Sequence, residues 1–428
     1  MLLNILKYGV SEGLAKLAPF LTTLYVAKFL SPELFGKYSL IVVLVEVVFI
    51  FVSFNSQATT RIDYFKESRV DFCLIKQNQI AISLLVAGAG ILSLFFLSKE
   101  EQLITLILFL SALFRTGAVF ILAIFQCSKQ VNVYIYSNMT FVGVLSISIY
   151  AFLQVGSSYF SWLFAMLIAS TVQFLLVLKL YGLKSFRAYW PKSITFNSLK
   201  GAFIPAVLFM PQAIGWWLKN GADRILINEF LGAEILGNYS LAFQFSSILI
   251  LVVTTVNLAL VPVINENLSN KKIDYVLKTL FSMALFCMVF TFALYFINVA
   301  ALDYAYKNIY PMAKNMMFYL CISNLFQALN MIYINVLYFE NEGRYVAKVV
   351  LLGFSLQVVF NFSLLYFFDK SVIEMILSSM FFNFIILFNL IRLMVVRKHY
   401  LMTLIVIEII FITLINLFYY YLNFYFIA

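Results

Sequence analysis

The chain has 428 residues, of which 64% are apolar, 18% are aromatic and only 11% are charged, and its formal net charge is +10. Because soluble globular domains carry roughly 25% charged residues, this composition excludes an ordinary soluble domain. The positive charge needs no nucleic-acid partner, since it follows from the membrane topology described below.

The apolar residues gather in runs of about 20, the length that a helix needs to cross a hydrocarbon core of roughly 30 Å. Since backbone groups in lipid must be hydrogen-bonded within their own segment, these runs predict an all-α polytopic membrane protein. The predicted spans in chain order are 6–29, 36–58, 77–97, 102–125, 131–154, 158–181, 201–229, 237–262, 276–299, 313–338, 344–368, 371–396 and 401–425. The first span is not expected to be a cleaved signal peptide, because Glu12 and Lys16 lie in its middle.

Two stretches of the chain repeat each other. FLSPELFGKYSL at 29–40 returns as FLGAEILGNYSL at 230–241, an offset of 201 residues, with seven of the twelve positions identical. Each copy ends one span and begins the next, so we interpret it as a tight helical turn on the outer face. Ser31, Pro32 and Glu33 suit such a turn, because Ser caps helices, Pro fits their first turn and an acid stabilises their N-terminus.

The same offset aligns the first three spans of the two halves, and the next three follow in matching order. Six spans is an even number, so both halves enter the membrane from the same side and are related by a pseudo-twofold axis along its normal. The sequence predicts an N-terminal six-helix bundle at 1–182, a basic cytoplasmic linker at 183–200, a C-terminal six-helix bundle at 201–398 and an extra hydrophobic helix at 399–428. Parallel repeats of this kind are a transporter architecture.

Loop charges predict the orientation of the chain, because cytoplasmic loops are enriched in Lys and Arg. With the N-terminus in the cytoplasm, the inside loops carry fifteen basic residues and the outside loops carry five. This count places Lys76 in the cytoplasmic loop before the third span. We therefore predict a multi-pass protein with a cytoplasmic N-terminus and a basic inner face that favours anionic membrane lipids.

Polar residues form a line along one face of the second span. The residues of this line are Ser39, Glu46, Ser53 and Gln57. The first three have hydroxyl-bearing equivalents 201 residues later, namely Ser240, Ser247 and Thr254. Such a line serves either hydrogen bonding between helices or, since Glu46 is a mid-membrane carboxylate, a water-filled lumen or a proton-binding site.

Charged residues inside other spans are costly in hydrocarbon and usually face a cavity or a partner. Glu12 and Lys16 are four residues apart, as are Lys219 and Asp223, so each pair either neutralises itself or lines a lumen. Arg115 has no acid in its own span. The seventh span also carries helix-breaking residues that suggest a bent or broken helix of the kind that lines transport sites. These residues are Pro205, Pro211, Gly215 and Gly221.

These polar residues supply a candidate site. A basic residue without an intramembrane partner suits an anionic or phosphate-bearing cargo. The candidate substrate-binding residues are Lys16, Arg115, Lys219 and Arg224. The candidates for the lumen or for ion coupling are Glu12, Glu46, Asp223, Gln57, Asn324 and Gln327.

No metal, cofactor or catalytic group is expected. The four cysteines are Cys73, Cys127, Cys287 and Cys321, and they include no C-x-x-C pair, so zinc and disulfide roles are not expected. The single histidine, His399, lies in a basic turn beside Arg397 and Lys398 and is interpreted as a loop residue.

At the repeated stretches the chain resembles a known family. YVAKFLSPELFGKYSLI (25–41) and NGADRILINEFLGAEILGNYSLAFQFSSIL (220–249) resemble the polysaccharide-exporter branch of the multidrug/oligosaccharidyl-lipid/polysaccharide superfamily, the Wzx-type flippases. Asp223 and Arg224 stand where this family has an Asp-Arg pair. The resemblance implies two six-helix bundles around a cavity that opens alternately to each face.

The implied cargo is an oligosaccharide repeat unit on undecaprenyl diphosphate, moved from the inner to the outer leaflet of a bacterial cytoplasmic membrane. Family lumens are typically cationic, which fits Lys16, Arg115, Lys219 and Arg224. Suspected ion-coupled antiport, by protons or sodium, makes Glu12 and Glu46 candidate carriers. A polysaccharide polymerase and a chain-length regulator are the implied protein partners.

Two other functions compete with this one. A drug or metabolite antiporter of the same superfamily would share the fold, but a cavity dominated by carboxylates would be expected for cationic drugs. A membrane polysaccharide polymerase would need acid/base machinery and usually a large outer loop, whereas the longest predicted outer connection has about a dozen residues, at 300–312.

Overall fold

The computed structural model describes residues 17–54, 56–156, 160–191, 199, 203, 210, 213–306, 309–340, 342–368 and 371–398. The regular elements of these residues are all helices, and ten helical stretches among them are long and apolar enough to cross a membrane. This confirms the predicted all-α polytopic membrane fold. The predicted span at 401–425 lies outside the described residues, as do residues 6–16 of the first span and most of 201–212 in the seventh.

In the N-terminal half a short apolar helix, Leu17–Ala27, precedes α2 (Pro32–Ser53), α3 (Ser56–Lys66), α4 (Arg69–Leu92), η1 (Ser93–Phe96), α5 (Lys99–Cys127), α6 (Val131–Val155), α7 (Ser161–Tyr181) and α8 (Leu183–Arg187). The C-terminal half contains η2 (Leu218–Ala222), α10 (Asp223–Leu231), α11 (Ala233–Ser246), α12 (Ile248–Ser269), α13 (Ile273–Ala305), α14 (Ala313–Phe339), α15 (Gly343–Phe368) and α16 (Val372–Lys398).

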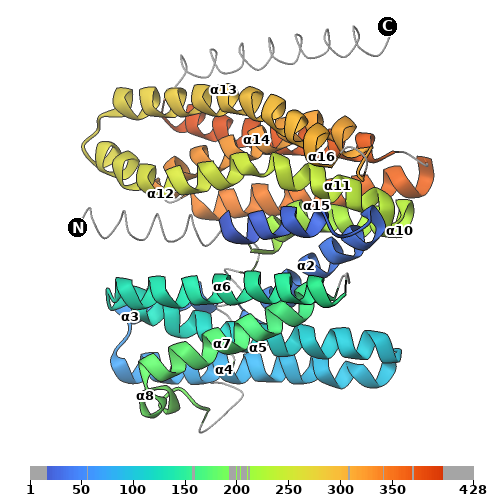
Figure 1. The fold of residues 1–428 in the computed structure, drawn as a ribbon. Coiled ribbons are helices and arrows are strands. Elements are labelled where there is room, and N and C mark those ends of the chain that lie inside the picture. Colours follow the sequence, from blue (N-terminus) through green and yellow to red (C-terminus); the bar gives the residue numbers. More distant parts are fainter. Residues whose placement is uncertain are drawn as a thin grey trace, which may run out of the picture.

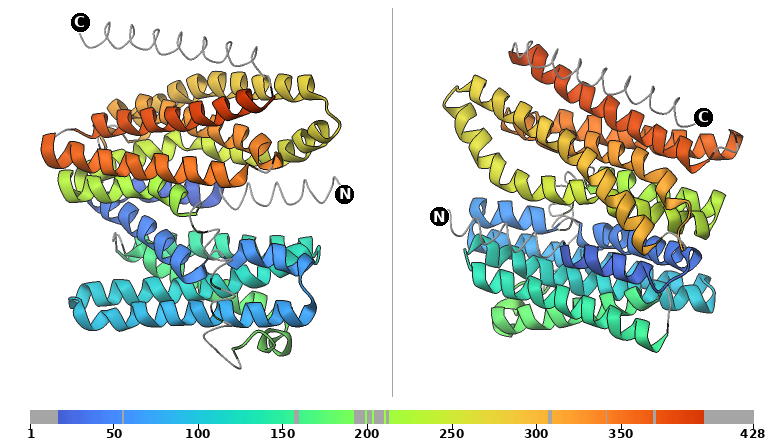
Figure 2. Two further views of the ribbon diagram at one scale, coloured as in Figure 1. Left: turned by 180° about the vertical axis from the view of Figure 1, so that it is seen from behind. Right: turned by 45° about the horizontal axis from the view of Figure 1, so that its top comes forward.

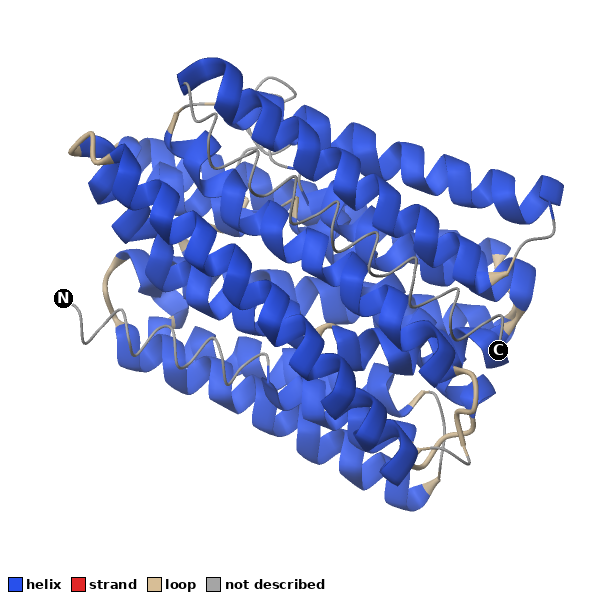
Figure 3. Ribbon diagram, turned by 90° about the horizontal axis from the view of Figure 1, so that it is seen from above, coloured by secondary structure: helices blue, strands red, loops and turns tan. Residues whose placement is uncertain are grey.

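The helices form two bundles. Figure 1 shows α3 to α8 in one bundle and α10 to α16 in the other, with α2 crossing obliquely between them. The view from behind in Figure 2 shows the same separation. Seen from above in Figure 3, the long helices run in nearly one direction, as expected for spans of one membrane. The domain boundaries drawn from the sequence remain predictions.

The start of α2 follows from its first residues. Ser31 is the N-cap, and its side-chain oxygen accepts a hydrogen bond from the backbone N–H of Leu34 at 3.4 Å. Pro32 occupies the first turn and Glu33 is the acid there, which confirms the helix start read from Ser31-Pro32-Glu33. The helix begins at residue 32, four residues before the predicted span.

The second span is broken near its other end. Phe54 has φ of 45°, a left-handed conformation that ends α2, and α3 begins anew at Ser56. The continuous span predicted at 36–58 is therefore wrong after residue 53. Gln57 belongs to α3, so it does not extend the line of Ser39, Glu46 and Ser53 along α2.

The two copies of the repeated stretch pack against each other. A Cβ atom added to Gly36 would collide with the backbone carbonyl of Ala233, and one added to Gly237 would collide with that of Pro32. Ser39 Oγ and Ser240 Oγ lie 2.7 Å apart and share a buried hydrogen bond. Gly36 and Gly237 are 201 residues apart, as are Ser39 and Ser240, so the repeat meets itself where α2 crosses α11.

Two tyrosines of the C-terminal bundle extend this contact. Tyr306 donates a hydrogen bond to the backbone carbonyl of Leu24 at 2.8 Å, and Tyr310 donates to that of Leu30 at 3.1 Å. The Tyr310 ring also lies edge-on to Phe35, with ring centroids 5.8 Å apart. A buried apolar core that contains residues of both halves surrounds these contacts.

We predict that Gly36→Ala weakens the joint between the bundles. The added methyl group meets backbone, which cannot rotate away, and overpacking of this kind costs about 1–3 kcal/mol. Gly143→Ala is the matched control, because a Cβ at this helical glycine meets nothing within 4 Å, and alanine favours helices. Thermal unfolding in detergent should show a lower Tm for Gly36→Ala alone. Equal Tm values would contradict the close contact.

Candidate functional site

A buried carboxylate lies in the C-terminal bundle. Asp223 begins α10 and is 4% exposed. Its Oδ1 accepts a hydrogen bond from Asn361 Nδ2 at 2.9 Å, and its Oδ2 accepts from Ser379 Oγ at 3.0 Å and Gln357 Nε2 at 3.3 Å. Gln357 and Asn361 are four residues apart on α15, so one face of that helix presents both amides. The carboxylate is therefore stabilised by three neutral donors from α15 and α16.

Lys219 lies one turn before Asp223, in the π-helical turn η2. Its side chain is 3% exposed, and its Nζ is 5.8 Å from the ring centre of Phe243 on α11. Among the described residues, no carboxylate oxygen lies within 4.0 Å of Lys219 Nζ, which is the distance limit for an ion pair. The ion pair considered between Lys219 and Asp223 is thus not formed, and their interaction is a longer-range one.

Arg224 places a second cation on the same ring. Its guanidinium carbon is 5.1 Å from the centre of Phe243, and its buried Nε has no hydrogen-bond partner in the described part of the chain. Tyr38 of α2 and Tyr239 of α11 interact with it electrostatically. An aromatic face attracts cations, but it does not neutralise them. The Phe243 ring therefore gathers two positive charges that form no ion pair with a described acid, and Asp223 interacts with both of them only at longer range.

This region lies against α2. Trp217 Nε1 donates a hydrogen bond to the backbone carbonyl of Val43 at 3.2 Å, and a Cβ added to Gly221 would contact the Val43 side chain at 2.7 Å. The η2 turn is a local widening of the helix, a feature that is frequent at functional sites. We call Lys219, Asp223, Arg224 and Phe243 the α10–α11 cluster. It borders the seam between the two bundles.

In the N-terminal half the two described candidate charges, Glu46 and Arg115, are paired with each other. Arg115 Nη1 donates to Glu46 Oε1 at 2.9 Å, which joins α5 to α2, and the guanidinium carbon lies 4.3 Å from the ring centre of Phe49. The side chains of Arg115 and Glu46 are 23% and 46% exposed. Arg115 has no acid in its own span, and the structure supplies one from the neighbouring helix.

The remaining candidates take different places. Asn324 Nδ2 donates to Ser246 Oγ at 2.9 Å, so it joins α14 to α11 within the C-terminal bundle. Gln327 is buried on the same helix, and its Oε1 has no partner among the described residues. Glu12 and Lys16 lie outside the described residues. The structure brings together Lys219, Asp223 and Arg224, and separately Glu46 and Arg115.

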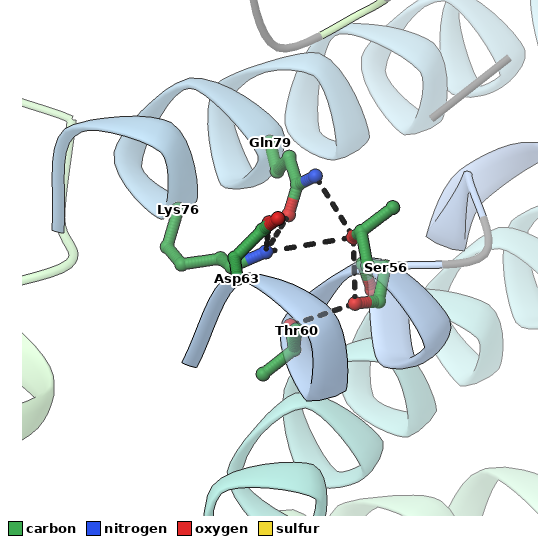
Figure 4. Close-up of polar contacts among 6 residues, drawn as sticks. Ser56, Thr60, Asp63, Lys76 and Gln79 are labelled. Carbon is green, nitrogen blue, oxygen red and sulfur yellow. Dashed lines mark hydrogen bonds and ion pairs between the residues drawn. The ribbon is translucent and has the colours of Figure 1, made fainter. Parts of the chain in front are cut away.

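A further buried charge was placed wrongly by the sequence analysis. Lys76 was assigned to a cytoplasmic loop, but α4 begins at Arg69 and Lys76 is fully buried, about two turns into that helix. Its Nζ donates to Asp63 Oδ2 at 2.6 Å, Gln79 Oε1 at 2.9 Å and Thr59 Oγ1 at 3.4 Å (Figure 4). Asp63 and Thr59 come from α3, so this network fastens α3 to α4.

One signal could have located this helix start. Ser68 is the N-cap of α4, and its side chain accepts from the backbone N–H of Asp71 at 3.2 Å. A Ser followed three residues later by an acid is a helix-start pattern. It would have placed the start eight residues before 77, the predicted edge of the span.

The two bundles of long apolar helices, joined by a repeat that packs on itself, define a polytopic membrane protein of the two-bundle transporter fold. A family model described as "Polysaccharide biosynthesis protein" matches residues 1–268, and the chain belongs to that family. A second model, MatE, matches residues 210–363.

A curated relative and several solved structures are similar to the chain. An "Uncharacterized membrane protein" of Haemophilus influenzae is 25% identical over 267 residues, which are 61% of this chain and 64% of that protein, so the match spans less than two thirds of the relative's length. The structure of "Lipid II flippase MurJ, inward closed conformation" has a TM-score of 0.67 at 16% identity, over 94% of this chain and 92% of that one. An inward-facing multidrug resistance MATE family transporter of the MOP superfamily has a TM-score of 0.66 at 12% identity, over 90% and 96%. These likenesses establish the shared fold.

We predict that Asp63→Asn destabilises the protein strongly, because it leaves the fully buried Lys76 ammonium without its acid. Breaking a buried pair in this way costs about 3–5 kcal/mol. Asp303→Asn is the matched control, since the Lys314–Asp303 pair at 2.8 Å is 50% and 37% exposed, and exposed pairs contribute about 1 kcal/mol or less. Denaturation of both variants in detergent measures the difference. Similar losses would contradict the buried position of Lys76.

Proposed function

We propose that this protein moves an oligosaccharide linked to undecaprenyl diphosphate from the cytoplasmic to the outer leaflet of a bacterial cytoplasmic membrane, by alternating access. The observation that carries the proposal is the charge of the α10–α11 cluster. Lys219 and Arg224 are two cations gathered on Phe243, while the hydrogen bonds of Asp223 go to neutral donors. With Asp223 ionised, the cluster keeps a net positive charge, and a diphosphate would supply the direct ion pairs that the two cations lack.

The chemistry of the two cations suits such a cargo. A guanidinium can donate two parallel hydrogen bonds to phosphate oxygens, and an ammonium acts as a compact point charge. Lys219 is buried and Arg224 is partly buried, and shielding from bulk water strengthens the attraction of a cation for an anion. Trp217 and Gly221, which flank Lys219 in the chain, lie beside Val43 of α2, so the cluster borders the seam, where a cargo handled between two repeats would be bound.

The contacts between the bundles support alternating access. Of the helices of the N-terminal half, α2 makes the most extensive contact with the C-terminal bundle. It is hydrogen-bonded across the seam at Ser39, in its first half, and at the Val43 carbonyl, near its middle. By the predicted topology the first half of α2 is the outer one, so the joint extends from the outer side to about the middle of the helix.

Ion coupling is part of the proposal. Glu46 is the half-exposed partner of Arg115, and protonation of its carboxylate would release the ion pair between α2 and α5. Because α2 also carries the contact with α11, this release would loosen the helix that joins the bundles. Glu46 is therefore the proposed carrier of the coupling ion, a proton or sodium. A cytoplasmic N-terminus and contacts with a polysaccharide polymerase and a chain-length regulator complete the proposal.

The rival function of a cationic-drug antiporter needs a carboxylate that is free to bind the drug. Among the described candidates, Glu46 is paired with Arg115 and Asp223 accepts three hydrogen bonds. The charge of the α10–α11 cluster therefore favours an anionic cargo over a cationic drug.

We predict that Lys219→Gln combined with Arg224→Gln abolishes export while the protein still inserts at normal levels. The measurement is the leaflet on which lipid-linked repeat units accumulate in cells that depend on this protein. Accumulation in the inner leaflet is expected, because the diphosphate loses both cations. The matched control, Lys179→Gln, removes an exposed cation of α7 and should not impair export. Normal export by the double variant, or single units accumulating in the outer leaflet as for a lost polymerase, would contradict the proposal.

A second prediction concerns coupling. Glu46→Gln should weaken transport and its dependence on the proton gradient, since the amide cannot carry a proton. The exchanged pair, Glu46→Arg with Arg115→Glu, keeps the ion pair and should retain more transport than either single change. Transport by Glu46→Gln that responds to the gradient as the natural protein does would remove Glu46 from coupling.

A further inference from the structure

A cavity lies in the N-terminal bundle, away from the α10–α11 cluster. It has a volume of about 240 Å³ and lies between α3, α4, α5, α7 and the segment after α8. Lys76 and Gln79 of the buried network in Figure 4 form part of its wall. Most of the other lining is apolar, including Leu113, Phe120 and Phe174. An apolar cavity of this kind is poorly suited to water, which needs two to four polar partners.

One polar group in the wall lacks a partner. Thr116 on α5 is 8% exposed and lines the cavity, and its Oγ1 makes no hydrogen bond within the described part of the chain. A buried hydroxyl without a partner costs free energy, but this oxygen is itself buried in the wall and is not exposed to the cavity, so the cavity offers a ligand an almost wholly apolar surface. Lys76 is not available to a ligand either, because Asp63, Gln79 and Thr59 already accept its three hydrogen bonds.

The exposed residues that line the cavity are of the types found at a membrane interface. Leu84 lines the cavity and is 39% exposed, on a helix that the membrane surrounds. Trp190 also lines it and is 53% exposed, and tryptophan is enriched where hydrocarbon meets headgroups. The cavity is therefore accessible from the lipid, near the end of the bundle that the sequence predicts to be cytoplasmic.

The basic segment 183–191 is held at this mouth. Tyr189 is buried against Phe72 and Phe120, with ring centroids 6.0 and 5.2 Å away. Gln77 Nε2 donates to the backbone carbonyl of Ala188 at 2.7 Å. These contacts fix the segment on the bundle. Segment 183–191 is therefore a packed part of the N-terminal bundle as well as the connection between the two halves.

The same segment carries charge beside the cavity. Phe186 and Trp190 line the cavity, and the exposed cations Lys184 and Arg187 lie within three residues of them in the chain. Neither cation forms an ion pair with a described acid. Basic sites next to apolar surface at the cytoplasmic end of a membrane protein suit anionic lipid headgroups.

We propose that this cavity binds an anionic phospholipid of the inner leaflet. The acyl chain lies among Leu113, Phe120 and Phe174, and Lys184 and Arg187 hold the phosphate. The bound lipid packs segment 183–191 against α4 and α5. This site is separate from the seam between the bundles, and it does not depend on the proposed cargo.

The test is lipid binding by the full-length protein, purified in detergent and observed by native mass spectrometry. The probes are phosphatidylglycerol and phosphatidylcholine with identical acyl chains. The natural protein should retain phosphatidylglycerol in preference. Lys184→Gln with Arg187→Gln should weaken this binding roughly tenfold, because two phosphate-binding charges are removed. The matched control, Lys271→Gln with Lys272→Gln, removes two exposed cations of the other bundle and should leave the binding unchanged.

Two further variants test the cavity itself. Ser83→Leu fills it from a buried position on α4, and Leu84→Trp narrows its mouth from a half-exposed position that tolerates a larger side chain. Each variant should bind less phosphatidylglycerol while its Tm stays unchanged. If Ser83→Leu does not fold, the result of Leu84→Trp decides.

Several results would overturn the proposal. Equal retention of phosphatidylcholine would show that the headgroup charge does not select the lipid. Equal losses of binding in Lys184→Gln with Arg187→Gln and in Lys271→Gln with Lys272→Gln would show that the position of the removed cations does not matter. Unchanged binding in Leu84→Trp would exclude the cavity. Displacement of phosphatidylglycerol by undecaprenyl diphosphate at this cavity would assign it to the transported lipid instead.

Discussion

The crossing of α2 and α11 joins the two bundles through direct contact between backbones. Gly36 and Gly237 lack the Cβ atoms that would separate the helices, and Ser39 and Ser240 share a hydrogen bond in the space that this closeness creates. Small residues serve membrane helices in this way, because no hydrophobic effect drives helices together in lipid. A joint of two equivalent helices would suit a movement of the two bundles relative to each other, as the proposed alternating access needs.

The two bundles treat charge differently, although they derive from one repeat. Within the N-terminal half, two cations of the membrane helices are paired, Arg115 with Glu46 and the buried Lys76 with Asp63. In the C-terminal bundle, neutral amides and a hydroxyl hydrogen-bond Asp223, and Lys219 and Arg224 have no such acid partner among the described residues. This asymmetry gives one bundle the character of a binding surface, while the charges of the other fasten its helices together.

Segment 183–191 links this electrostatic pattern to the membrane. It lies between the halves in sequence, but Tyr189 and the bond from Gln77 anchor it to the N-terminal bundle. Through this segment, the proposed phospholipid would stabilise the end of α4 that the Lys76 network already holds to α3. The lipid site and the cargo site would then lie in different bundles, and lipid composition could affect transport without competing with the cargo.

Composition and the length of the apolar runs determined the class of fold, because lipid leaves the backbone no alternative to helices at these lengths. The 201-residue offset identified the repeated stretch and its helix start, but only the tertiary structure shows that the two copies pack on each other. The partners of the charges could not be predicted. Helical periodicity relates residues within one helix, whereas Arg115 finds Glu46, and Asp223 finds Asn361, on other helices. The break at Phe54 and the depth of Lys76 likewise depend on how α3 packs on α4, and only the tertiary structure decides that packing.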